Sequence, residues 1–97
     1  MEGRPPISDG RSGIKRVLLR ALNKNQIILL NKISKNSTRT ITSISSLVSS
    51  EFDIPVSTVK LNCRILKNLD LIDFETSKPV SLTQAGKAVL KILGEAE

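Results

Sequence analysis

The stretch from residue 57 to residue 86 constrains the fold most, because a helical pattern is followed there by two strand patterns and a second helix start. An apolar stripe with the helical spacing i, i+4 and i+7 is formed by Val59, Cys63 and Leu66. Two short apolar runs follow, Leu71–Phe74 and Val80–Leu82, and the polar segment Glu75–Pro79 between them supplies a turn. The order of helix, hairpin and helix predicts an α+β fold that is mainly α-helical.

Amphipathic patterns predict further helices on both sides of this stretch. Apolar residues at helical spacing occupy residues 14–22, 26–34, 44–50 and 85–93, and the striped helix extends from about Val56 to Leu69. Three helix starts are expected to carry a side-chain cap, at Asn25, Thr42 and Thr83. Pro55 suits the first position of the striped helix, and Asp70 ends it where a glycine would fit most easily. Arg39–Ile41 is a third candidate strand that pairs with the hairpin.

Length and composition predict one small domain with an aliphatic core. The chain has 97 residues, near the lower end of what buries an adequate core alone, and is 39% hydrophobic with two Phe and no Trp or Tyr. Residues 1–13 are rich in Gly and Pro and offer almost nothing to bury. We therefore predict a flexible basic arm over residues 1–13 and a single domain with terminal helices over residues 14–97.

The charge favours a polyanionic partner, because the chain has a net charge of +6 and a pI of about 9.9. The striped helix carries three basic residues, Lys60, Arg64 and Lys67, and no acid, so its local field favours phosphate. With two aromatic residues in the whole chain, stacking on exposed bases is nearly unavailable. The composition therefore disfavours a binder of single-stranded nucleic acid.

An enzyme is not expected. The chain has no His, which removes the commonest general base and metal ligand, and it has no Gly-rich phosphate loop. Its single cysteine, Cys63, lies on an apolar face, where a thiol is a poor nucleophile. We therefore expect no catalytic residue, no cofactor and no metal site.

Cysteine usage and hydropathy predict a cytoplasmic, intracellular protein. One cysteine excludes a disulfide framework and fits a reducing compartment. No N-terminal run resembles a signal peptide, and the longest apolar run, Ile27–Leu30, is too short to span a membrane. No membrane partner is expected.

Two motifs resemble those of small prokaryotic, especially archaeal, winged helix-turn-helix regulators. The first runs from Ser57-Thr58-Val59-Lys60 through Cys63 and Leu66 to Leu71-Ile72, and is similar to the family's recognition-helix pattern. The second, Ser81-Leu82-Thr83-Gln84-Ala85-Gly86, is similar to its strand-to-helix junction LTxxG. The likeness covers about residues 25–93. Three departures are Asp70 in place of a glycine, Cys63 in place of a core leucine, and a wing tip with one basic residue, Lys78.

The resemblance implies a three-helix core, a small β-hairpin wing and additional terminal helices. It also implies that a homodimer binds double-stranded DNA as a transcriptional regulator, with the helix of residues 57–68 in the major groove. The apolar faces of residues 14–22 and 83–93 suggest that the N- and C-terminal helices pair across the two-fold axis. Packing of both helices within one subunit is the alternative.

A helical wheel selects the candidate DNA contacts. Successive helical residues are rotated by roughly 100°, so the helix side opposite the core stripe, with its two flanks, faces outward. We add the start of the preceding helix and the wing tip. The candidate contacts are Ser57, Thr58, Lys60, Leu61, Asn62, Arg64, Lys67, Asn68, Thr42, Ser43 and Lys78. Among these, Arg64 suits guanine, Asn62 or Asn68 suits adenine, and Leu61 suits a thymine methyl. The lysines and the helix N-terminus suit phosphate.

Leu61 leaves a second function open. Leu61 and Ile65 fit either packing under a neighbouring element or an apolar patch for a protein partner. Residues 51–75 carry three basic against five acidic side chains, which fits a protein surface better than a DNA surface. The alternative function is therefore a winged-helix protein-protein interaction module in a transcription or replication assembly.

The N-terminal arm of residues 1–13 also has two interpretations. Its basic residues Arg4 and Arg11 fit either a minor-groove contact or a solvated tail.

Overall fold

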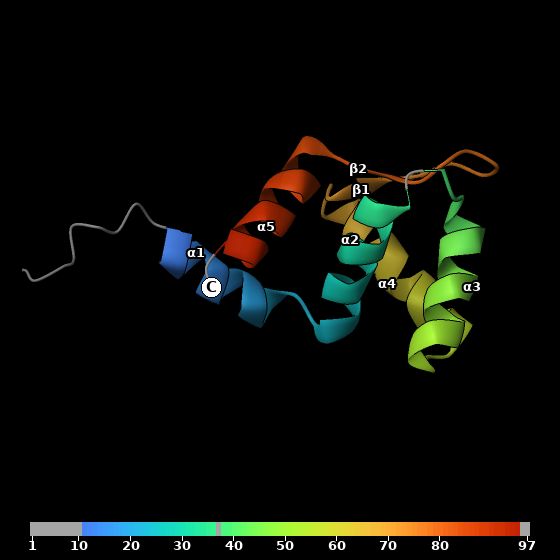
Figure 1. The fold of residues 1–97 in the computed structure, drawn as a ribbon, viewed down its shortest axis with the longest axis horizontal. Coiled ribbons are helices and arrows are strands. Elements are labelled where there is room, and N and C mark those ends of the chain that lie inside the picture. The colour runs from blue at the N-terminus through green and yellow to red at the C-terminus, as the bar shows by residue number, and fades with distance from the viewer. Residues whose placement is uncertain (1–10, 37, 96–97) are drawn as a thin grey trace, which may run out of the picture.

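The computed structural model describes residues 11–36 and 38–95 (Figure 1). Within these ranges the elements follow in the order α1 (Arg11–Ala21), α2 (Lys24–Lys35), α3 (Ile41–Phe52), α4 (Val56–Asn68), β1 (Ile72–Asp73), β2 (Ser81–Leu82) and α5 (Gln84–Glu95). This order confirms a mainly helical α+β fold. Helix α1 begins before the expected end of the arm, because Arg11 already belongs to it. Residues 1–10, with Arg4, lie outside the described residues.

An aliphatic core joins α2, α3, α4 and the hairpin. Helix α3 packs against α4, α2 packs against both, β1 contacts α4, and β2 contacts α2. The apolar side chains buried there are Leu22, Leu29, Leu30, Ile33, Ile44, Val48, Val59, Cys63, Leu66, Leu71, Ile72 and Val80. All three residues of the predicted stripe on α4 are among them, which confirms the core-facing side of that helix.

The terminal helices α1 and α5 form a pair at one end of the molecule (Figure 1). Helix α5 also contacts α2 and β2, and its residues Val89, Leu90 and Leu93 pack against the core. The outer side chains of α1 are less covered: the exposed fractions of Ile14, Val17 and Leu19 are 47%, 63% and 51%. Packing within one subunit therefore leaves apolar surface on α1.

The predicted hairpin is confirmed. Its strands pair antiparallel, with Ile72 opposite Leu82 and Asp73 opposite Ser81. The third candidate strand is reduced to one bridge between Thr40 and Pro79, next to a hydrogen bond of 2.9 Å from the Val80 N–H to the Arg39 carbonyl oxygen. This bridge holds the start of α3 beside the hairpin.

Two helix starts differ from the predicted positions. Helix α2 is capped by Asn23 and not by Asn25, because Asn23 and Gln26 form a reciprocal capping box. The Asn23 Oδ1 accepts from the Gln26 N–H at 2.8 Å, and the Gln26 Oε1 accepts from the Asn23 N–H at 3.1 Å. Helix α3 is capped by Thr40 and not by Thr42, which lies exposed in the first turn.

Helix α4 starts and ends with unusual residues. Pro55 is its N-cap and not its first helical residue, so no side chain caps this helix. Asp70 follows its C-terminus with a φ of 62°, which confirms that a glycine would fit there most easily. Two more non-glycine residues, Asp53 and Ser77, have left-handed φ values of 54° and 69°. All three stand in turns.

Thr83 caps α5 as predicted and also ties this helix to the end of α4. Its hydroxyl accepts from the Gly86 N–H at 3.0 Å and donates to the Asp70 carbonyl oxygen at 2.6 Å. Gly86 is buried against the backbone of Leu71, and a Cβ at this position would overlap the Leu71 carbonyl oxygen. The junction therefore requires a residue without a side chain.

Candidate nucleic-acid interface

Helix α4 carries most of the predicted site residues. Ser57, Lys60, Leu61, Arg64, Lys67 and Asn68 are exposed, Thr58 is half-buried, and Asn62 is buried. With the core stripe facing inward, two edges run along the exposed surface. We call Lys60, Arg64 and Lys67 the basic edge. We call Leu61, Ile65 and Leu69 the apolar edge.

The prediction that Asn62 is accessible to a base is wrong. Its side chain is 5% exposed and makes three hydrogen bonds within the protein. The Asn62 Oδ1 accepts from the Asn23 Nδ2 at 3.3 Å and from the Gln26 Nε2 at 3.1 Å. Its Nδ2 donates to the Thr58 carbonyl oxygen at 2.9 Å. Asn62 therefore connects the capping box of α2 to the middle of α4.

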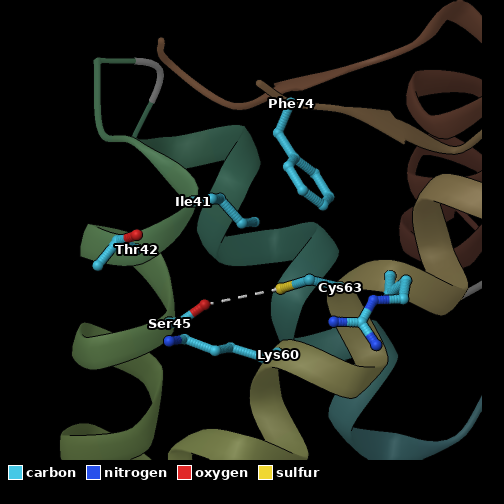
Figure 2. A pocket seen from close by; sticks show the side chains of 7 residues that line it. Ile41, Thr42, Ser45, Lys60, Cys63 and Phe74 are labelled. Atoms are coloured by element: carbon cyan, nitrogen blue, oxygen red, sulfur yellow. Dashed lines mark hydrogen bonds between the residues drawn. The ribbon is translucent and has the colours of Figure 1, made fainter. Parts of the chain in front are cut away.

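The basic edge borders a pocket of about 220 Å³ between α3, α4 and the end of β1. The pocket is lined by Ile41, Thr42 and Ser45 from α3, by Lys60, Cys63 and Arg64 from α4, and by Phe74 after β1. Figure 2 shows the Lys60 side chain extending from α4 toward α3, and the Phe74 ring pointing into the space between the helices. The structure thus brings together Thr42, Lys60 and Arg64, which the sequence placed on two separate helices.

The charges of Lys60 and Arg64 have no partner in the part of the chain that the structure describes. Over residues 11–36 and 38–95, neither side chain makes a hydrogen bond or an ion pair with another residue. The two residues lie one helical turn apart, so their charged groups share one side of α4. Both side chains line the same pocket.

Two other predicted phosphate contacts are engaged with the hairpin. The Lys67 Nζ donates to the Phe74 carbonyl oxygen at 2.9 Å and lies 4.6 Å from the centre of the Phe74 ring. The Lys78 Nζ lies 3.2 Å from the Glu75 Oε1, and both side chains are more than half exposed. Such an exposed pair is weak and exchanges readily with solvent. Lys67 is thus held more firmly than Lys78.

The start of α3 adds one cation that the sequence analysis missed. The Arg39 Nη1 donates to the Ser43 hydroxyl at 2.9 Å, so the predicted contact Ser43 is already engaged. Arg39 is exposed, directly precedes the cap residue Thr40, and has its backbone paired with the hairpin. A basic residue immediately before a helix cap was the available signal.

Cys63 forms part of the pocket floor. Burial raises the pKa of its thiol, and a weak contact with the Ser45 hydroxyl, 3.9 Å from the Sγ, acts in the opposite direction. The thiol is therefore protonated at neutral pH and is a poor nucleophile. Within the described ranges, no three His, Cys, Asp or Glu side chains lie together so as to hold a metal ion. None of the described helices combines the length and the apolar character needed to cross a bilayer.

No protein-family model, curated protein or solved structure matches this chain.

Proposed function

We propose that the chain is a winged helix-turn-helix protein that binds double-stranded DNA and regulates transcription. In this arrangement α3 and α4 are the helix-turn-helix, α4 lies in the major groove, and the β1–β2 hairpin is the wing. The observation that carries the proposal is the pair Lys60 and Arg64, two cations without a partner among the described residues, on an acid-free helix beside the start of α3. With α4 in the groove, Lys60 and the start of α3 would meet backbone phosphates, and Arg64 would reach the base edges.

The exposed side of α4 offers groups that suit base edges. Arg64 can donate two parallel hydrogen bonds to guanine O6 and N7, Asn68 suits adenine, and Leu61 suits a thymine methyl. Asn62 is left out of the proposed contacts because its amide is satisfied inside the protein. Sequence preference is therefore expected to depend mainly on Arg64.

Backbone phosphates are expected at two helix starts. No side chain caps α4, and the Thr58 N–H already donates to the Pro55 carbonyl oxygen at 3.0 Å, so a phosphate near Ser57 and Thr58 would meet the N–H groups of Val56 and Ser57. Thr42 presents a hydroxyl in the first turn of α3 across the pocket from Lys60, and Arg39 lies just before that helix. Smaller contributions are expected from residues already engaged within the protein, namely Lys67, Lys78 and Ser43.

The test is a selection from a random-sequence duplex pool, run at about 50 and 200 mM salt. A palindromic motif that survives the higher salt is the expected result. Binding that falls by orders of magnitude at the higher salt and recovers no motif would reduce the interaction to phosphate attraction and would contradict a specific regulator.

Pairing of two copies through α1 and α5 is part of the proposal. Ile14, Val17 and Ala21 lie at i, i+3 and i+7 along α1, and all three are exposed in the single chain. A second copy would cover them and would set two α4 helices about 34 Å apart, one turn of DNA. Sedimentation should therefore show a dimer that Val17→Glu dissociates. A wild-type chain that stays monomeric at the concentrations used for DNA binding would contradict this.

A second candidate function is docking to a protein of a transcription or replication assembly through the apolar edge. Leu61 and Leu69 are each 52% exposed, and with Ile65 they recur at i, i+4 and i+8, the spacing of a helix that lies in a groove. Under this alternative, Leu61→Arg abolishes partner binding while DNA binding is absent throughout. Val56→Arg, at an exposed site on the same helix outside the edge, is the control. Equal partner binding by both variants would count against docking.

A further inference from the structure

The pocket beside the basic edge combines an apolar interior with a cationic rim. Ser45 and Cys63 lie at its base but are 0% and 1% exposed, so a bound molecule would contact the walls of the pocket and not these two side chains. Ile41 and Phe74 supply apolar walls, and Figure 2 shows the Phe74 ring directed toward Cys63. A phosphate alone would use the rim and leave this interior empty. The lining therefore fits a ligand with an apolar part and an anionic part.

The size of the pocket restricts the apolar part to about one ring. Enclosed cavities of about 150 Å³ bind benzene, whereas sites for drug-sized ligands measure about 300–1,000 Å³. At about 220 Å³, the pocket between α3 and α4 has room for one six-membered ring with one small substituent. A larger aromatic system would extend into solvent.

The rim restricts the anionic part. Arg64 and Lys60 stand one turn apart on α4 and have no partner among the described residues. A guanidinium matches the planar geometry of a carboxylate with two parallel hydrogen bonds, and the lysine adds a point charge. None of the side chains that line the pocket is acidic, so nothing in the lining competes for these cations.

We propose that this pocket binds a small aromatic carboxylate of the size of benzoate. The ring lies between Ile41 and Phe74, above Cys63, and the carboxylate contacts Arg64 and Lys60. Because the same two cations carry the proposed DNA contact, ligand and duplex compete. This regulatory consequence rests on the proposed function, whereas binding of the carboxylate itself does not.

The test is a titration of the isotope-labelled full chain with sodium benzoate, followed by amide chemical shifts. Saturable shifts in the millimolar range are expected at Thr42, Cys63 and Phe74. Acetate lacks the ring, benzyl alcohol lacks the charge, and inorganic phosphate lacks the apolar part, so all three should bind at least tenfold more weakly. Phosphate or acetate binding as tightly as benzoate would overturn the proposal in favour of a simple anion site. Non-saturating shifts scattered over the surface would overturn it as well.

Charge variants locate the contact. Arg64→Gln should weaken benzoate binding about tenfold, the usual effect of losing a charge-assisted hydrogen bond. Lys91→Gln removes the same charge from an exposed site on α5 and should leave the affinity unchanged. Equal weakening by the two variants would mean that net charge attracts the ligand, and would refute the assigned pocket.

A competition experiment separates the pocket from the proposed function. Benzoate should displace a labelled random-sequence duplex from the chain, and sodium chloride at the same ionic strength should displace less. If benzoate binds at the pocket and no duplex binds at any salt concentration, the pocket stands and the proposed function fails. If the duplex binds and benzoate shifts no pocket amide, the pocket fails and the proposed function stands.

Discussion

Replacing Asn62 with alanine tests whether the polar contact between α2 and α4 holds the fold together. The substitution removes a side chain that is 5% exposed and makes three hydrogen bonds. It leaves the Gln26 Nε2, on a side chain that is also 5% exposed, without its acceptor. An unsatisfied buried donor costs about 1–3 kcal/mol, and the higher helix propensity of alanine returns about 0.6 kcal/mol. We expect a net loss of about 1.4 kcal/mol in the free energy of unfolding, within a range of about 0.4–2.4 kcal/mol.

Urea unfolding followed by far-ultraviolet circular dichroism measures this loss. The slope of the free energy of unfolding against urea concentration should be the same for the variant and the wild type. The matched control is Asn31→Ala. Asn31 is exposed, and its Nδ2 donates to the Ile27 carbonyl oxygen one turn earlier, the same kind of bond that Asn62 makes to Thr58. The control should stay within about 0.5 kcal/mol of the wild type. Equal losses for the two variants would refute the reasoning, because burial of the amide would then carry no cost.

The remaining predictions concern the α5 junction, the DNA contacts and the buried thiol. Gly86→Ala should cost about 1–3 kcal/mol in the free energy of unfolding, because the added methyl group meets the Leu71 backbone. Gly94→Ala should gain about 0.5–1 kcal/mol, because a Cβ there has nothing within 4 Å. Similar shifts of the two variants in thermal denaturation would contradict this. In quantitative DNA titrations, Arg64→Ala should relax sequence preference at a cost of about 1–3 kcal/mol, and Lys60→Ala should weaken all sequences alike and lower the salt slope by about one. Indistinguishable variants at matched salt would remove these roles. Because burial raises the Cys63 pKa, the folded chain holds this proton more tightly than the unfolded chain, so stability falls as the pH rises above the ordinary value of 9.0. Cys63→Ala should abolish that part of the pH dependence. If the free energy of unfolding had the same pH profile in Cys63→Ala as in the wild type, the thiol would not contribute.

The sequence predicted best where a local period decides the structure. The stripe of Val59, Cys63 and Leu66 could lie only on the core side of a helix, and the structure buries all three. The hairpin followed from two apolar runs around one polar turn, and its register leaves Ile72 buried and Asp73 exposed. In both cases neighbours in the chain settle which side faces inward.

Helix starts were harder to predict because several capping residues stand close together. Asn23 and Asn25 are equally good caps by residue type. Asn23 caps α2 because Gln26 lies three residues later and its side chain reaches back. The Asn-x-x-Gln spacing of a capping box is present in the sequence at Asn23 and absent at Asn25.

Asn62 and the pocket depend on contacts that no local pattern contains. Asn62 stands at the border of the buried stripe, and its amide is buried because Asn23 and Gln26 come from α2 to satisfy it. The pocket needs Phe74 from the end of β1 and Thr42 from the start of α3. Tertiary packing brings these residues together, so the sequence could identify candidates but not their arrangement.

Within residues 11–36 and 38–95, glycines occupy helices, whereas the residues with a left-handed backbone are not glycines. Asp53, Asp70 and Ser77 have positive φ values in turns, whereas Gly86 and Gly94 lie inside a helix. A side chain in the left-handed region costs about 1 kcal/mol relative to glycine, and an exposed helical glycine costs about as much relative to alanine. Single substitutions can therefore raise the thermal stability of this chain, namely Asp70→Gly, Ser77→Gly and Gly94→Ala. Each gains stability in the range of about 0.5–1 kcal/mol, and none replaces a buried core residue.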